Sequence, residues 1–190
     1  MRASLAQGRT GIAGAAAAAI TLWAILGGLV LLAVVLMNVI SVVGATVGRP
    51  FPGDFEMTEV GIAVAAFAFL PWCQLTDANV TADIFTAGAR ERTVAALKFL
   101  ASVVALGFAA LLLWRMSLGM IDQRDYNYTT AILQVPIWWG FVPILISLAL
   151  LVVASAITLV ESARHAATGH PPPREAATTE VPHEPDTDTR

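Results

Sequence analysis

Four long stretches without a charged residue constrain this chain more than any other feature. They run from Thr10 to Gly48, from Val60 to Thr76, from Phe99 to Trp114 and from Tyr126 to Val160. A helix that crosses the hydrocarbon core of a bilayer needs about 20 apolar residues. The stretches are near this length or longer, so they predict an all-α integral membrane protein with four transmembrane helices.

The composition agrees with a membrane domain. Hydrophobic residues make up 57% of the chain and charged residues 13%, whereas a soluble domain has about 25% charged residues. We expect the spans at about residues 22–43, 57–76, 94–114 and 136–160, within a membrane domain of residues 22–161. We also expect a disordered cytoplasmic tail at residues 162–190, which are rich in Pro, Thr and acidic residues and nearly lack large apolar ones.

The first apolar stretch is too long for the core of a cleaved signal peptide, which has about 7–15 residues, so we expect it to stay as a membrane anchor. Its front is weakly apolar. Residues 1–21 are therefore expected to form the cytoplasmic N-terminus and a helical extension at the membrane interface. Alternatively, one tilted helix uses the whole length of the stretch.

Positive charge is densest between the second and third spans. The Lys and Arg residues near the spans are, in chain order, Arg2, Arg9, Arg49, Arg90, Arg92, Lys98, Arg115, Arg124, Arg164 and Arg174. Cytoplasmic loops of membrane proteins carry an excess of such residues. We therefore expect the second loop, and with it both termini, to lie in the cytoplasm of a bacterial inner membrane.

Residues that carry chemistry are scarce. The histidines lie at or beyond the last span, at His165, His170 and His183, and Cys73 is the single cysteine. Phosphate-binding, zinc-protease and serine-hydrolase motifs are missing from the sequence, and no acid lies at the middle of a span, where ion pathways usually need one. These observations argue against an enzyme, against a cofactor or metal centre, against nucleic-acid binding and against a transporter that works alone.

Two polar features lie at the edges of the second span. A span of about 20 residues draws Glu59 inside the outer membrane boundary. There it either pairs with an arginine or backbone donor of another helix or lies among the headgroups near the helix dipole. After the span comes "DANVTADIFTAGARER", which includes Asn79, Asp83 and Arg90. Val80, Ile84 and Ala87 share one face of a helix there, which predicts a short interfacial helix, with a plain polar loop as the alternative.

The start of the fourth span carries a third feature, "TTAILQVPIWWGFVP". Pro136 suits the first turn of a helix, where its missing N–H costs nothing. Trp138 and Trp139 suit an interfacial aromatic belt in contact with membrane lipids. Pro143 lies deeper and is expected to kink or loosen the span.

These landmarks together resemble the small, Q-type (DctQ-like) permease subunit of tripartite ATP-independent periplasmic (TRAP) transporters. In that family the second span begins with a Thr/Ser-Glu pair, matched by Thr58 and Glu59. A segment like "G-x-H-I-x-V-D" follows and is matched by "DANVTAD", in which Asp83 keeps the acid and Asn79 stands in place of the usual His. The fourth span opens "G-I-P-x-W", matched by "QVPIWW", with a second proline matched by Pro143.

The resemblance covers residues 22–161 and implies a function. The family's small subunit packs against the scaffold of a large permease subunit of about twelve spans. The large subunit carries the substrate and sodium sites, and a periplasmic substrate-binding protein delivers an organic acid-type solute. The resemblance therefore implies a scaffold partner in secondary active symport, without a cofactor of its own.

Within this frame, the candidate contacts are Glu59 and the segment from Asn79 to Asp83, one near each membrane surface. They would contact the partner subunit or this subunit's own helices. Arg90 and the residues Pro136, Trp138, Trp139 and Pro143 are further candidate structural contacts. The alternatives are the four-span subunit of a tripartite tricarboxylate transporter and an orphan structural four-helix membrane protein.

Overall fold

The computed structural model describes residues 12–49, 51–76 and 91–168, and it is helical almost throughout. The four helices are α2 (Ile12–Thr46), α3 (Asp54–Leu75), α5 (Glu91–Asp125) and α6 (Trp138–Thr168). Each contains a segment long and apolar enough to cross a membrane. The prediction of an all-α membrane protein with four spans is thus confirmed. The expected interfacial helix falls mainly in residues 77–90, outside the described residues.

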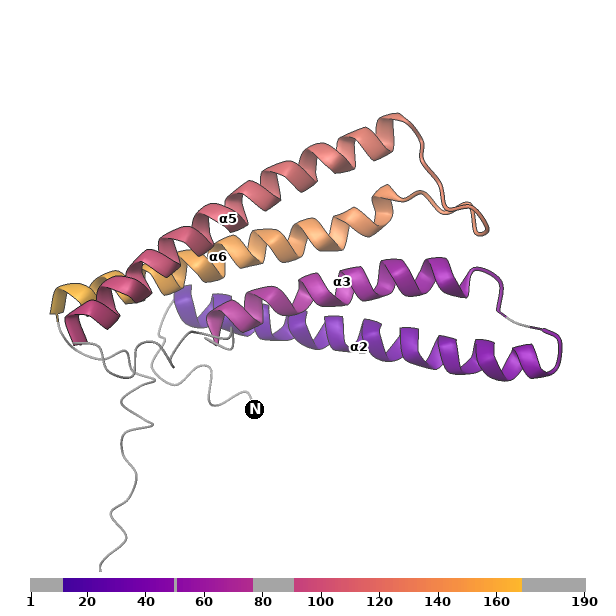
Figure 1. Cartoon of the computed structure of the whole chain (residues 1–190), viewed down its shortest axis with the longest axis horizontal. Helices are drawn as coiled ribbons and strands as arrows, with labels where there is room; N and C mark the ends of the chain where they lie inside the picture. Colours follow the sequence, from indigo (N-terminus) through magenta and orange to yellow (C-terminus); the bar gives the residue numbers. More distant parts are fainter. Residues whose placement is uncertain (1–11, 50, 77–90, 169–190) are drawn as a thin grey trace, which may run out of the picture.

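Two ends of the molecule are useful as landmarks. The loop end carries the α2–α3 connection at residues 47–53 and the α5–α6 connection at residues 126–137, and the termini end carries the first turn of α2 and the last turn of α6 (Figure 1). All four helices run between these two ends. Consecutive helices along the chain therefore point in opposite directions, as expected for a chain that crosses a membrane four times.

The helices pack as a layer in the order α5, α6, α3, α2 (Figure 1). The extensive contacts are between α5 and α6, between α6 and α3, and between α3 and α2, with a smaller contact between α2 and α6. In the most apolar segments of α3 and α6, 28% of the residues are buried, against 17% in α2 and 11% in α5. The outer helices therefore offer most of their apolar surface to whatever surrounds the protein.

The buried core lies toward the termini end. Ala17, Ile20, Leu75 and Ala154 are each at most 2% exposed, and Trp72, Leu150 and Ile157 pack around them. Two of the four core residues, Ala17 and Ile20, belong to the stretch expected to extend along the interface. That stretch packs among the other helices and is continuous with the rest of α2, so its residues belong to one long helix.

Two other helices are also longer than the expected spans. α5 continues past Trp114 to Asp125, because its added turns keep packing on α6: a Cβ placed on Gly119 would lie 3.5 Å from Cε1 of Phe141. α6 continues past Val160 to Thr168. There the hydroxyls of Ser102 and Ser162 lie 3.1 Å apart and join α5 to α6. Residues 162–168 are therefore helical, and the rest of the expected tail lies outside the described residues.

Single polar contacts tie neighbouring helices together inside the apolar layer. The indole N–H of Trp23 donates to the hydroxyl of Ser147 at 2.8 Å and joins α2 to α6. The amide of Gln74 donates to Thr158 at 3.3 Å and joins α3 to α6. Hydrogen bonds of this kind supply orientation where the hydrophobic effect does not distinguish helix from lipid.

Candidate interaction sites at the loop end

A ladder of polar side chains joins α2 to the start of α3. The amide of Asn38 donates to the hydroxyl of Thr58 at 2.7 Å, and it also contacts the carbonyl of Val34 at 2.9 Å. One turn farther along α2, the hydroxyl of Ser41 donates to the carboxylate of Asp54. Thr58, the first residue of the Thr-Glu pair, therefore serves a contact between two helices of this chain.

Glu56 forms a second contact, which the sequence did not indicate. Its carboxylate accepts the backbone N–H groups of Ile132 at 2.7 Å and of Leu133 at 3.1 Å. Both donors belong to the α5–α6 connection. The neighbouring Gly53 has a φ of +75°, and a Cβ there would lie 2.7 Å and 3.0 Å from the two Cδ atoms of Leu133. The first turn of α3 thus holds the connection in place by hydrogen bonds and by close packing.

The α5–α6 connection has a defined internal structure. The N–H of Thr130 donates to the carbonyl of Val135 at 3.0 Å, and the N–H of Ile137 donates to the carbonyl of Tyr128 at 3.0 Å. These bonds flank an antiparallel bridge between Thr129 and Pro136. The hairpin-like turn leaves Glu56 facing the N–H groups at its tip.

Glu59, the second residue of the Thr-Glu pair, is exposed. Among the described residues it has no hydrogen-bond or ion-pair partner. Arg49, Arg115 and Arg124 form no ion pair with it, and the guanidinium of Arg124 lies over the ring of Trp138, 5.8 Å from its centroid. The structure thus separates Thr58, which bonds inward, from Glu59, which faces outward.

An apolar groove of about 460 Å³ lies between α2 and α3 on this half of the molecule. Most of its lining is aliphatic, and its two polar side chains, Asn38 and Thr58, bond to each other. The lining residues are Leu31, Val34, Val35, Asn38, Val39, Val42, Val43, Thr58 and Ile62. A groove of this chemistry suits hydrocarbon, either from lipid or from the aliphatic side chains of another helix.

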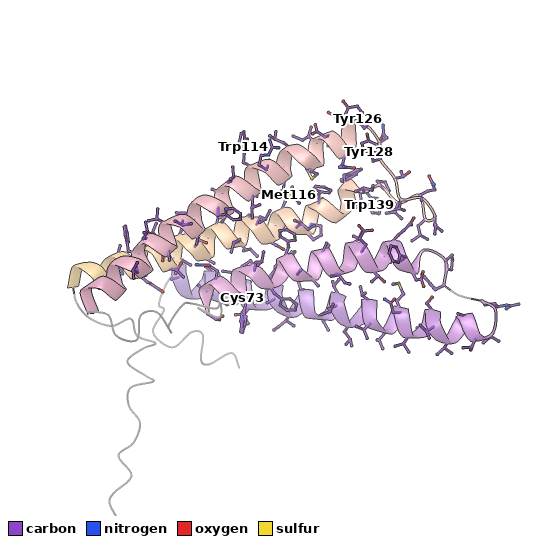
Figure 2. The ribbon with its side chains drawn as sticks, viewed as in Figure 1. Cys73, Trp114, Met116, Tyr126, Tyr128 and Trp139 are labelled. Atoms are coloured by element: carbon purple, nitrogen blue, oxygen red, sulfur yellow. The ribbon has the colours of Figure 1, made fainter. Side chains whose placement is uncertain are left out.

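The four predicted residues around the start of α6 differ in their surroundings. Pro136 precedes α6, and its carbonyl accepts the N–H of Trp139 at 3.2 Å. The rings of Trp138 and Trp139 meet edge to face at 6.1 Å, and Trp139 is 58% exposed. Figure 2 shows Trp139, Tyr126 and Tyr128 together at the loop end. Aromatic residues of this kind are enriched where a membrane protein meets the headgroup region.

Pro143 lies inside α6, which continues through it. Its carbonyl accepts the hydroxyl of Ser147 at 2.8 Å, and this hydroxyl in turn accepts the indole N–H of Trp23. Pro143 therefore belongs to the polar contact between α2 and α6. A second proline, Pro71, lies buried inside α3 and was not anticipated from the sequence.

The candidates at the other membrane surface, Asn79, Asp83 and Arg90, lie outside the described residues. Cys73 is a free, half-buried thiol on the termini half of α3 (Figure 2). Within the described ranges, no group of three or more His, Cys, Asp or Glu side chains is placed to hold a metal ion. The sites that the structure builds at the loop end join helices and connections of this chain, through Asn38 to Thr58, Ser41 to Asp54 and the α5–α6 connection to Glu56.

Comparison with known proteins gives a family match. A family model described as "Tripartite ATP-independent periplasmic transporters, DctQ component" matches residues 31–165. No curated protein and no solved structure matches the chain. The matched family is a component of transporters and not a family of enzymes. Its match includes α3 and α5, α6 as far as residue 165 and α2 from residue 31 onward, with the ladder, the Glu56 contact and the groove. The chain is therefore a multi-pass membrane protein that belongs to the DctQ family, the small component of TRAP transporters.

Proposed function

We propose that this chain is a scaffold subunit that binds a large permease subunit and supports sodium-driven, binding-protein-dependent uptake of an organic acid-type solute. The large subunit would carry the substrate and sodium sites. A periplasmic binding protein would deliver the solute. The family match supports this assignment, since the family is the DctQ component of a three-part system.

The observation that carries the proposal is the layered arrangement of the helices. Each helix contacts its neighbours in the layer, and large apolar side chains cover much of the outside of the described residues. The polar side chains inside the layer mostly bond to one another, as Asn38 does with Thr58 and Trp23 with Ser147. A layer of this kind suits a support for another membrane protein, whereas a carrier needs a polar path and a site near the midplane.

We further propose that the loop end faces the periplasm of a bacterial inner membrane and the termini end the cytoplasm. The support is the excess of Lys and Arg in the second loop, which contains Arg90 and Arg92. In this orientation the α5–α6 connection and Glu59 lie on the side from which a binding protein approaches.

The test is joint expression of this chain, carrying an affinity tag, with a large, roughly twelve-span TRAP permease from the same organism. Purification in mild detergent is expected to recover the two chains in equal amounts. Proteoliposomes that contain both chains should take up solute when the binding protein and a sodium gradient are supplied, and proteoliposomes with the permease alone should not. Recovery of the tagged chain as a lone monomer would refute the proposal.

A further inference from the structure

The outward face of α3 differs from the rest of the apolar surface. Along this helix five exposed residues recur every three or four positions and form one stripe, and the exposed Met57 and Val60 lie outside it. The stripe, which we call the α3 face, consists of Phe55, Glu59, Ile62, Ala66 and Leu70. Because α3 is an inner helix of the layer, with α2 on one side and α6 on the other, this stripe lies on a broad face of the molecule.

The α3 face is continuous with the groove between α2 and α3. Ile62 belongs to both, since it is 49% exposed and also lines the groove. The groove extends from Ile62 and Thr58 across to the valine and leucine side chains of α2. Together, the α3 face and the groove form a row of exposed side chains next to a concave surface. The side chains of another helix can pack into the groove.

Glu59 determines what kind of partner this surface fits. It is one turn inside the start of an apolar helix, and it has no partner among the described residues. Ionisable residues within transmembrane segments almost always pair with another group. Lipid tails do not provide a counter-charge, so a carboxylate at this depth favours a protein that brings a cationic side chain.

The outer face of α5 shows what a surface suited to lipid looks like in this chain. Between Phe99 and Trp114 its exposed residues are apolar without an acid among them, for example Leu100, Val104, Phe108 and Leu111, which are 48–62% exposed. The α3 face instead combines an acid with a neighbouring groove. Polar residues mark helix–helix contacts in membranes, so the acid distinguishes the α3 face from the outer face of α5.

We propose that a transmembrane helix of the large permease subunit docks on the α3 face. An arginine or lysine of that helix, near the loop end, pairs with Glu59, and its aliphatic side chains enter the groove. The inference rests on the proposed function, because it names where the large subunit binds. The carboxylate acts as a contact in assembly and not as a ligand of the coupling ion.

A photo-cross-linking residue, p-benzoylphenylalanine, tests the surface directly. It is placed at Ile62 on the α3 face or, as the matched control, at Val104 on α5, which is 62% exposed. Both variants are expressed with the large permease and irradiated in membranes. The Ile62 variant is expected to give an adduct that contains the permease, and the Val104 variant is not.

The outcomes separate the possible occupants. An adduct between two copies of this chain, or cross-linking to lipid alone at Ile62, would overturn the inference. Adducts with the permease from Val104 only would do the same. If unsubstituted protein fails to form the complex at all, the proposed function itself has failed, and that result is visible before any cross-linking.

Charge variants test the pairing of Glu59. Glu59→Lys is expected to reduce the recovered complex at least about tenfold, equivalent to about 1.4 kcal/mol, and Glu59→Gln to reduce it less. Asp125→Lys changes the net charge equally at the same end from an exposed position and should leave recovery unchanged. Circular dichroism of each variant purified alone shows whether it has folded.

Uptake by the residual complex completes the test. Its sodium dependence should match that of the unsubstituted protein, because Glu59 contributes to assembly only. An effect of Glu59→Lys no larger than that of Asp125→Lys would overturn the pairing. Normal assembly of Glu59→Gln with an altered sodium dependence would instead place Glu59 in ion coupling.

Discussion

Replacement of Gly27 by alanine is the sharpest test of how α2 packs on α3. Gly27 is buried, and a Cβ placed on it would lie 2.6 Å from the Cβ of Ala68 and 3.6 Å from the carbonyl oxygen of Ala65. Carbon atoms in contact are normally about 3.5–4.0 Å apart. The Cβ of Ala68 is fixed to the backbone of α3 and cannot rotate away, so the two helices must separate.

Two effects of opposite sign determine how much Gly27→Ala changes the free energy of unfolding. Alanine favours the helix over glycine by about 1 kcal/mol. Overpacking costs about 1–3 kcal/mol, and the rigid neighbour places this site at the upper end of that range. Separation also stretches the 2.7 Å hydrogen bond between Asn38 and Thr58 in the same interface. We therefore expect Gly27→Ala to lower the free energy of unfolding by about 2 kcal/mol.

Gly107 supplies the matched control. It is in α5, and a Cβ there would meet no atom within 4 Å. Gly107→Ala therefore keeps the helix-forming gain without the clash, and it should raise the free energy of unfolding by up to about 1 kcal/mol. The two variants make the same chemical change and are expected to shift stability in opposite directions.

The assay is unfolding by sodium dodecyl sulfate in mixed micelles, followed by circular dichroism. A second variant, Gly27→Ala with Ala68→Gly, moves the methyl group from one helix to the other and should recover most of the lost stability. If Gly27→Ala is as stable as Gly107→Ala, or if the double variant recovers nothing, α2 and α3 do not meet at these residues and the packing argument is wrong.

Three further predictions concern the loop end and the orientation. Gly53→Ala should lower the free energy of unfolding by about 2–5 kcal/mol, since the φ of Gly53 is +75° and a leucine side chain fills the space for a Cβ. Gly48→Ala should lower it by only about 1–2 kcal/mol, because Gly48 has a φ of +73° but a Cβ there meets nothing within 4 Å. Equal losses for the two variants in the same assay would contradict this prediction. Glu56→Ala should speed hydrogen exchange at the two amides that the carboxylate accepts, and Glu56→Gln should have a smaller effect; unchanged exchange would show that the contact does not hold the connection. A Gly88→Cys variant in a Cys73→Ala background should resist thiol reagents that cannot cross the membrane when they are added outside intact cells, and ready labelling would reverse the proposed orientation.

The Thr58–Glu59 pair shows how far a sequence motif can be read. The sequence identified both residues as a landmark at the head of the second span. It left open whether Glu59 finds its partner within the chain. In the structure Thr58 bonds to Asn38 and Glu59 is exposed. Which of the two side chains faces α2 depends on the rotation of α3 about its axis, and the packing of the neighbouring helices sets this rotation.

Glu56 was missed for a different reason. Its partners, Ile132 and Leu133, are more than 70 residues away in sequence, and they contribute backbone N–H groups. Backbone donors carry no signature in the residue types. Only the folded path of the α5–α6 connection brings them to the carboxylate.

The sequence by itself determined the four spans, because charge and hydropathy decide which segments leave water for the bilayer. Its aromatic, proline and Thr-Glu landmarks indicated the family by resemblance. The tertiary structure decided the order of the helices in the layer, the packing of Ala17 and Ile20 in the core, the length of α5 and the outward position of Glu59. The physical reason is that lipid tails are as apolar as the side chains of a helix interface. Hydrophobicity therefore does not mark which side of a helix faces its neighbours, and close approach of small residues and single hydrogen bonds, such as Gly27 on Ala68 and Trp23 on Ser147, make that choice.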